Sequence, residues 1–238
     1  MAPSSQNRAV EVSGVWHRYG EGALAKPVLQ EVSLSIDAGE VVLLTGPSGS
    51  GKTTLLTLIG ALRAVQQGEV TVLGTQLSGA KEAAREKLRQ RIGFIFQLHN
   101  LLEFLTARQN VAMALELDPA LSERERMARA DAALASVGLG DKLDVLPREL
   151  SGGQRQRVAI ARALVHEPGL ILADEPTAAL DSKTGAEAMH LLRDLAKQQG
   201  RTILIVTHDP RILDIADRVV AMEDGRIIEA PRLAKAAE

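Results

Sequence analysis

The sequence contains no cysteine, which excludes disulfide bonds, thiolate metal sites and cysteine nucleophiles. It also lacks an excess of basic residues, since 28 Lys and Arg stand against 30 Asp and Glu, for a net charge of −2. Proteins that follow a nucleic-acid backbone usually carry a clear basic surplus. We therefore expect no nucleic acid as a main ligand.

Long apolar runs are missing as well. The strongest, "TILIV" and "LLTLIGAL", fall far short of the roughly 18 apolar residues that indicate a membrane-spanning helix. The opening "MAPSSQNRAV" shows no apolar run behind a basic region, so we expect no signal peptide. The sequence predicts a protein that stays inside the cell and reaches a membrane only through a partner.

Strand and helix patterns alternate along the 238 residues, of which 45% are hydrophobic. Residues 9–16 and 28–36 alternate as strands, and short apolar strands separated by helices return after residue 151. This order predicts an α/β fold with a largely parallel sheet and helices on both faces. Between them, residues 98–147 are rich in Ala, Leu, Glu and Arg, and we expect a mostly helical, inserted subdomain there.

Two local patterns near the end of the chain are well defined. Apolar residues recur at helical spacing from about Thr184 to Gln199, and Gly200 follows where a terminating glycine belongs. The "EDG" at residues 223–225 separates two apolar runs and predicts a tight β-hairpin turn.

The stretch "GPSGSGKT" from Gly46 to Thr53 fits the phosphate-binding pattern G-x-x-x-x-G-K-[ST], between an apolar strand and a helix. Glycines let backbone amides surround phosphates, and the helix N-terminus adds partial positive charge. Lys52 would reach the β- and γ-phosphates, and the Thr53 hydroxyl would bind Mg²⁺. A chance match is expected in roughly one chain in a hundred. The predicted ATP-binding residues here are Gly46, Pro47, Ser48, Gly49, Ser50, Gly51, Lys52, Thr53 and Thr54.

Polar residues end three other apolar strands, at the sheet edge where ligands bind in open parallel sheets. After "LILA", Asp174 would bind Mg²⁺ and Glu175 would accept a proton from water attacking the γ-phosphate. His208 would contact the γ-phosphate, and Gln97 would contact Mg²⁺ and the water. Each is weak evidence alone, and the phosphate loop strengthens all of them. We expect surface or packing roles for the other histidines, His17, His99, His166 and His190.

A second glycine-containing loop, "LSGGQ", spans Leu150 to Gln154 and opens a helix. Ser151, Gly152 and Gly153 would offer a hydroxyl and amide groups to an anion. The loop has neither a lysine nor a hydroxyl placed for Mg²⁺, so it cannot hold a nucleotide alone. We predict that it is half of a site.

The order of these motifs resembles the ATP-binding-cassette ATPases over almost the whole chain, and "LSGGQ" is specific to that family among phosphate-loop proteins. The resemblance implies a RecA-like core with an N-terminal antiparallel β subdomain and an inserted helical subdomain. It implies one domain over residues 1–238, with residues 1–97 and 151–238 as the catalytic core and 98–150 as the helical subdomain.

The resemblance also implies residue roles, with ATP and Mg²⁺ as cofactors. Two such domains pair head to tail, and residues 150–154 of each close over the partner's ATP. Tyr19 would stack on adenine, although a lone strand tyrosine is more often packing, and Asp181 in "AALD" would act across the dimer. Ala178 stands where many members have Ser. The implied Mg²⁺ ligands are Thr53, Gln97 and Asp174, with Glu175 as general base and His208 as γ-phosphate sensor.

Residues 96–117, "FQLHNLLEFLTARQNVAMALEL", resemble the macrolide-exporter and lipoprotein-release class, and most closely the cyanobacterial DevA-type heterocyst-glycolipid exporter ATPases. Glu103 replaces the usual Pro, and Gln109 the commoner Glu. The resemblance implies integral membrane permease partners, with a periplasmic membrane-fusion adaptor as a further partner, and a location on the cytoplasmic face of the inner membrane. Four apolar residues of this loop either face a partner or pack inside: Leu101, Leu102, Phe104 and Leu105.

Several alternatives remain open. We favour a homodimer over a heterodimer because both motif sets are intact. A regulatory ATPase that acts on a membrane partner without transport would use the same residues. A phosphate-loop kinase is disfavoured, because "LSGGQ" has no role in one.

Overall fold

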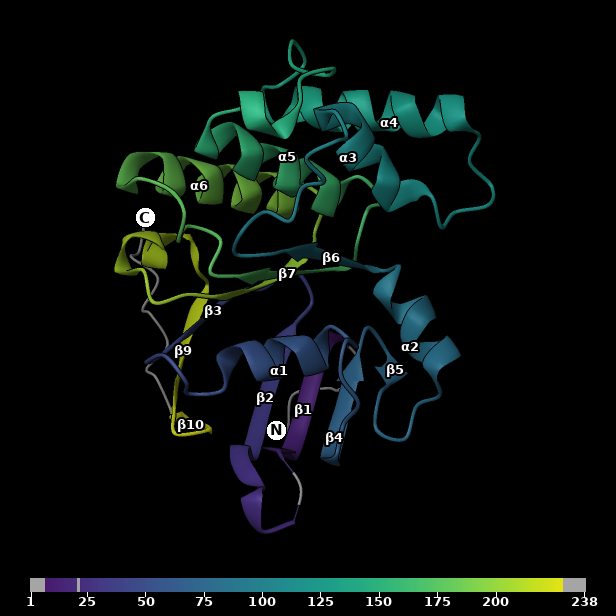
Figure 1. Cartoon of the computed structure of the whole chain (residues 1–238). Coiled ribbons are helices and arrows are strands. Elements are labelled where there is room, and N and C mark those ends of the chain that lie inside the picture. The colour runs from purple at the N-terminus through teal and green to yellow at the C-terminus, as the bar shows by residue number, and fades with distance from the viewer. Residues whose placement is uncertain (1–6, 21, 229–238) are drawn as a thin grey trace.

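The computed structural model describes residues 7–20 and 22–228, which form two sheets and the helices around them (Figure 1). The smaller sheet lies beside helix α1 (Lys52–Ile59), and the remaining long helices lie on the other side of the larger sheet (Figure 1). Within these residues, no helix has the length and apolar character needed to cross a membrane.

The smaller sheet is antiparallel, and its strands are in the order β2-β1-β4-β5. A register shift in β1 between Val12 and Val15 includes Gly14, which has a φ of 56°. Because such a bulge adds a residue, both valines stay on the buried side. The expected N-terminal strands are confirmed, and two later strands join them. The bounds are β1 Arg8–Tyr19, β2 Lys26–Asp37, β4 Gln67–Val72 and β5 Thr75–Gln76.

The larger sheet has the order β10-β9-β3-β8-β7-β6, and all neighbouring strands pair in parallel except β10 with β9. Alternate residues of β3 enter two different cores: Val41 and Leu43 pack with the core of α5 and α6, whereas Val42 and Leu44 pack with α1 and the smaller sheet. The predicted parallel sheet with helices on both faces is confirmed. The strands are β3 Val41–Thr45, β6 Ile92–Ile95, β7 Leu170–Asp174, β8 Thr202–Val206, β9 Arg218–Glu223 and β10 Arg226–Ile228.

The helical segment is less helical than expected. Within residues 98–150 the α-helices are α3 (Ala107–Ala112) and α4 (Glu123–Ser136), with single turns at Met113–Leu115 and Pro147–Glu149. Glycine and proline interrupt the Ala- and Leu-rich pattern: Gly138 has a φ of 76° just after α4 ends. Helix α5 (Gly152–Leu164) packs on α3, α4 and β6, so it links this segment to the sheet. That residues 98–150 act as a separate subdomain stays a prediction.

Both predicted local features are confirmed. Helix α6 (Ser182–Gln198) begins two residues earlier than expected, because Asp181 accepts a hydrogen bond from the Thr184 amide and caps it. It ends at Gln198, and Gly200 follows with a φ of 65°, so that the Arg201 amide donates to the Ala196 carbonyl at 2.8 Å. At the hairpin, Asp224 and Gly225 have φ values of 45° and 76°, as a type I′ turn requires. The remaining helices are Gly22–Leu24, α2 Glu82–Arg89 and Pro210–Ile215.

Candidate functional site

The phosphate loop connects the carboxyl end of β3, an interior strand of the larger sheet, to helix α1. Gly46 has a φ of 142°, and a Cβ there would lie 2.0 Å from the Met222 carbonyl oxygen. Gly51 caps α1 with a φ of 99° and has no side chain to occupy the helix end. Only glycine fits both positions, and the first amides of α1 are left without a side-chain cap.

Lys52 lies inside the curve of this loop. Its side chain is buried, and its ammonium donates to the carbonyls of Gly46 and Pro47, each at 2.8 Å. The Ser50 hydroxyl accepts a longer contact of 3.4 Å from the same ammonium, and Ser50 itself is buried behind the loop. The positive charge is therefore fixed at the centre of the loop by its backbone.

A hollow of about 680 Å³ opens in front of the loop. It brings together three strand-end residues predicted from separate parts of the sequence with the phosphate loop, and its size suits a nucleotide's phosphates. The lining residues are Val28, Gln97, Glu175, His208, Gly46, Pro47, Ser48, Gly49, Gly51, Lys52, Thr53 and Thr54.

Thr53 and Asp174 meet beside this hollow. The Thr53 hydroxyl donates to Asp174 Oδ1 at 3.2 Å. Burial raises the pKa of Asp174, and the Thr53 hydrogen bond acts against this rise. Mg²⁺ prefers oxygen ligands and usually needs only one or two protein carboxylates beside phosphates. The hydroxyl and carboxylate oxygens, with Gln97 on the same hollow, fit that ion, and their role as its ligands stays a prediction.

Glu175 has an uncommon backbone conformation, with a φ of 46°. Its amide donates to the Val206 carbonyl at 2.9 Å, which ties the residue to the next strand. Its Oε2 lies 2.9 Å from His208 Nδ1, and the histidine side chain is 72% exposed while the glutamate is 17% exposed. A left-handed residue held this way at a strand end is typical of functional sites. The carboxylate is thus held beside His208, and both residues line the hollow.

Tyr19 lies on a neighbouring hollow with Leu62 and Arg63. Its hydroxyl is 3.3 Å from the Thr54 hydroxyl, and the Arg63 guanidinium carbon lies 5.1 Å from the ring centroid. One ring face is thus covered by a cation, as in other cation–π pairs. Stacking of adenine on Tyr19 stays a prediction that concerns the other face.

The signature loop, residues 150–154, is separate from this hollow: among the described residues, none of these five lines it. Leu150 is buried, and the Ser151 hydroxyl accepts from the Gln154 amide while Gln154 accepts from the Ser151 amide. A Cβ on Gly153 would lie 2.3 Å from Thr184 Cγ2. The helix end is therefore closed by its own capping box in the single chain.

The sequence reasoning did not anticipate the role of Arg162. Arg162 on α5 is buried, and it donates to the carbonyls of Asn100 at 2.6 Å and His99 at 2.5 Å. Burial lowers the pKa of Arg162 and likewise that of His99. Both carbonyls belong to residues with positive φ, and Leu98 alone separates them from Gln97. Arg162 thus holds the turn that follows Gln97, and no local pattern in the sequence signals this contact.

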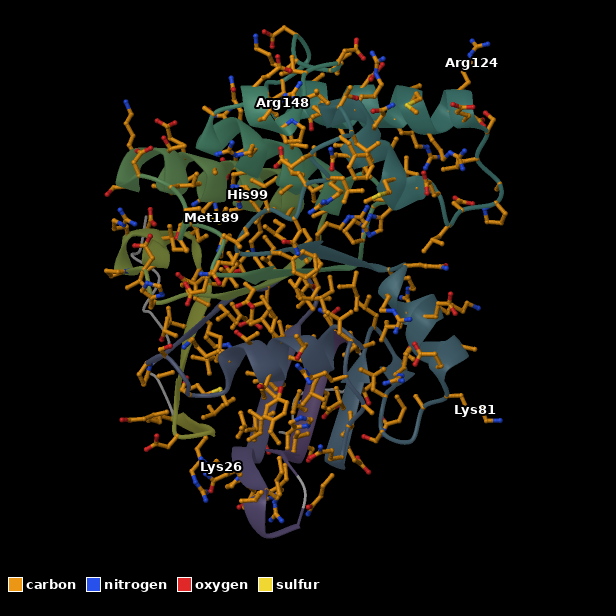
Figure 2. All side chains as sticks on the ribbon, viewed as in Figure 1. Lys26, Lys81, His99, Arg124, Arg148 and Met189 are labelled. Carbon is orange, nitrogen blue, oxygen red and sulfur yellow. The ribbon has the colours of Figure 1, made fainter. Side chains whose placement is uncertain are left out.

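His99 packs inside the molecule, in the half that contains α5 and α6, whereas Lys26 and Lys81 project from the opposite half (Figure 2). None of the four histidines assigned to surface or packing lines the hollow described above. His190 lies 3.2 Å from Asp214 and joins α6 to the turn after β8.

Comparison with known proteins gives consistent results. The ABC transporter family model matches residues 29–178. The chain is 45% identical over 229 residues to the lipoprotein-releasing system ATP-binding protein LolD of Anaeromyxobacter dehalogenans, covering 96% of each protein. It is 43% identical over 221 residues to the macrolide export ATP-binding/permease protein MacB of Marinobacter nauticus, covering 92% of this chain. The chain spans about a third of that protein's length, 34%.

A solved structure agrees with the fold. The ATP-binding cassette MJ0796, in a dimeric post-hydrolysis state bound to ADP and Pi, superposes with a TM-score of 0.86 at 40% identity. The match covers 94% of this chain and 99% of that one. The family model spans more than half of the chain, and the LolD relative is 45% identical over nearly its whole length. The chain therefore belongs to the ABC transporter family, as an ATP-hydrolysing ATP-binding cassette.

Proposed function

We propose that this chain is the ATPase subunit of a membrane exporter, and that two copies close around two ATP molecules. One observation carries the proposal. The hollow gathers the phosphate loop, Glu175 and His208, whereas the signature loop lies outside it. Each chain thus has one phosphate-binding hollow and, apart from it, one self-capped helix end, and a head-to-tail pair would bring the two together. That MJ0796 was solved as a dimer with ADP and Pi supports this arrangement.

In the hydrolysis step, the loop amides and Lys52 hold the phosphates. Bound Mg²⁺, held by Thr53, Asp174 and Gln97, would supply positive charge to the phosphate oxygens. Glu175 accepts a proton from the water that attacks the γ-phosphorus, as the bond to the β-phosphate oxygen breaks and leaves ADP and Pi. His208, 2.9 Å from Glu175, orients the carboxylate and contacts the γ-phosphate.

A second copy supplies Ser151, Gly152 and Gly153. In the single chain the Ser151 hydroxyl already accepts from the Gln154 amide, at 3.2 Å. Binding the partner's γ-phosphate would therefore add to or replace a cap that keeps the helix end ordered. We infer a homodimer because one chain contains both intact half-sites.

The exporter assignment depends on a partner surface beside α3. Leu98, Phe104 and Leu117 are exposed at 74%, 76% and 65%. Leu117 also lines a groove of about 660 Å³ with the stacked rings of Phe94 and Phe96. Of the four loop residues left open by the sequence, Phe104 faces outward, Leu101 packs against the core, and Leu102 and Leu105 are partly buried.

We infer that this groove holds the cytoplasmic end of an integral permease subunit, because its stacked aromatic rings and the exposed Leu117 form one apolar surface open to a partner. The chain would then work at the cytoplasmic face of the inner membrane. The likeness to MacB and LolD supports this class of machine. A periplasmic adaptor and the likeness to DevA-type exporter ATPases remain part of the proposal. Co-purification with a permease, lost on Leu117→Asp, would test the contact.

Replacement of Glu175 by Gln tests the function. We expect ATP turnover to fall by at least about a hundredfold, since general bases typically contribute that much, while ATP still binds. The variant should accumulate as an ATP-bound dimer, measured by light scattering beside a phosphate-release assay. Glu187→Gln, on the exposed side of α6, serves as the matched control. Unchanged turnover would overturn Glu175 as the base, and a strictly monomeric ATP complex would favour a phosphate-loop kinase instead.

A further inference from the structure

Two loops that leave neighbouring parallel strands are joined by three polar contacts. Residues 175–182 follow β7 and residues 207–211 follow β8. The contacts begin at the catalytic pair and end at the first residue of α6. The three pairs are Glu175 with His208 at 2.9 Å, Thr177 with Asp209 at 3.1 Å, and Ser182 with Arg211.

The middle contact is buried, and its carboxylate accepts several hydrogen bonds. Thr177 and Asp209 are 3% and 8% exposed, and the threonine hydroxyl donates to Asp209 Oδ2. Arg211 donates two hydrogen bonds to the same carboxylate, from Nε to Oδ1 at 2.6 Å and from Nη2 to Oδ2 at 2.7 Å. Its hydrogen bond lowers the pKa of Asp209 to about 2, so the carboxylate remains ionised at neutral pH. A two-point pair of this kind fixes direction as well as distance.

The outer contact reaches the start of α6. Arg211 Nη1 donates to the Ser182 hydroxyl, and the adjacent Asp181 caps the helix through the Thr184 amide at 3.1 Å. The hydrogen bond to Asp209 raises the pKa of Arg211, and the charge of Asp181 adds to the rise. The guanidinium therefore lies between the loop that carries His208 and the helix end that carries Asp181.

We propose that Arg211 is a positioning residue for ATP hydrolysis, which makes the loop of His208 and the start of α6 move as one unit. Through Asp209 and Thr177 it holds His208 against Glu175, and through Ser182 it links this pair to Asp181. The inference rests on the proposed function, because Asp181 can report a partner only in a dimer. A displaced helix start would then displace the catalytic pair.

Arg211→Ala tests the proposal in the full chain. We expect kcat to fall about tenfold with an unchanged KM for ATP, because misplaced catalytic groups slow the reaction while the phosphate loop is untouched. Arg211→Lys keeps the charge and should recover part of the rate. Arg193→Ala is the matched control. Arg193 lies in α6 and pairs with its neighbour Asp194, so its loss should leave kcat unchanged.

Ser182→Ala is a milder second variant, because it removes only the outer acceptor and leaves the Arg211–Asp209 pair intact. It should lower kcat less than Arg211→Ala does, again with KM unchanged. In either variant, adding Asp181→Ala should lower kcat by a smaller factor than it does in the wild type, because the contact between Arg211 and Ser182 is already lost. This non-additivity separates positioning from general loss of stability, and Ser182→Ala decides the question if Arg211→Ala fails to fold.

The outcomes are distinguishable. Wild-type kcat in both Arg211→Ala and Ser182→Ala would overturn the inference, as would fully additive effects with Asp181→Ala. A wild-type chain that hydrolyses ATP, with a Glu175→Gln variant that dimerises on ATP, would in that case leave the proposed function standing. A wild type that neither hydrolyses ATP nor dimerises would overturn the proposed function and this inference with it.

Discussion

Two helices in this chain begin at glycine-containing loops, and their ends differ. Helix α1 starts at Gly51, which has no side chain to cap it, and the buried Lys52 ammonium sits in the loop before it. Helix α5 starts at Ser151, whose hydroxyl and backbone are both engaged with Gln154. An uncapped end with a fixed cation can hold phosphates alone, whereas a self-capped end without a cation can only add to a site built elsewhere.

The largest test of this comparison removes the cation. Lys52→Ala should lower ATP affinity by about a hundredfold, because hydrogen bonds to charged groups contribute about 1.5–3 kcal/mol and this ammonium serves more than one phosphate oxygen. Titration of a fluorescent ATP analogue would measure it. Lys142→Ala, an exposed lysine paired with its neighbour Asp141, is the control. Near wild-type affinity in Lys52→Ala would mean that the loop amides suffice, and the contrast with α5 would be lost.

Crowding the signature loop should come next in size. Gly153→Ala brings a Cβ to within 2.3 Å of Thr184 Cγ2, and such overpacking costs about 1–3 kcal/mol of unfolding free energy. ATP binding at the phosphate loop should not change. Thr184→Ser removes the colliding methyl group, so the double variant should regain stability in a denaturant titration. A Gly153→Ala chain as stable as the wild type would contradict the close packing of α5 on α6.

Acid should lower the stability contributed by Asp209, near the phosphate loop, more than that contributed by residues 150–154. Asp209 follows β8 at the same edge of the larger sheet as the phosphate loop, and its pKa falls from 3.8 to about 2 on folding. Because the folded pKa is the lower one, this stabilisation is present above about pH 4 and is lost as the pH falls toward 2, worth about 1–2 kcal/mol. Residues 150–154 contain no titratable side chain. The stability gap between wild type and Asp209→Asn should therefore narrow from pH 5 to pH 2, and a constant gap would refute the assignment.

The smallest expected effect separates capping from catalysis. Ser151→Ala should lower the unfolding free energy by about 1 kcal/mol, as the loss of a helix cap does. It should also slow ATP hydrolysis by more than it weakens the binding of ATP to the isolated chain. Ser122→Ala is a close control, because Ser122 caps α4 with the same two-way contact to Glu125. Equal losses of stability with hydrolysis impaired only in Ser151→Ala would confirm the role. Equal hydrolysis in both variants would reduce Ser151 to a cap.

Much of the fold was predictable, since its signals are local. Each of these signals lies within a few residues of the chain: the alternation in β1 and β2, the apolar run of β3, and the glycines of residues 46–51. The segment 98–150 was predicted less well, because composition favours helix while Pro119 and Gly138 interrupt it. Arg162 and Arg211 escaped the sequence reasoning altogether. Their partners lie 62 and 63 residues away for Arg162, and 29 residues away at Ser182 for Arg211.

Residue type and short spacing were enough to predict the chemical groups of the site: a phosphate loop, two carboxylates, a histidine and a second half-site. Which of these groups lie together depends on the three-dimensional packing. Parallel pairing of β7 with β8 brings Glu175 against His208, and the packing of α5 leaves Ser151 outside the hollow. The reason is physical: residue type fixes what a side chain can bind, while the distances between remote segments arise only when the strands pair and both cores close.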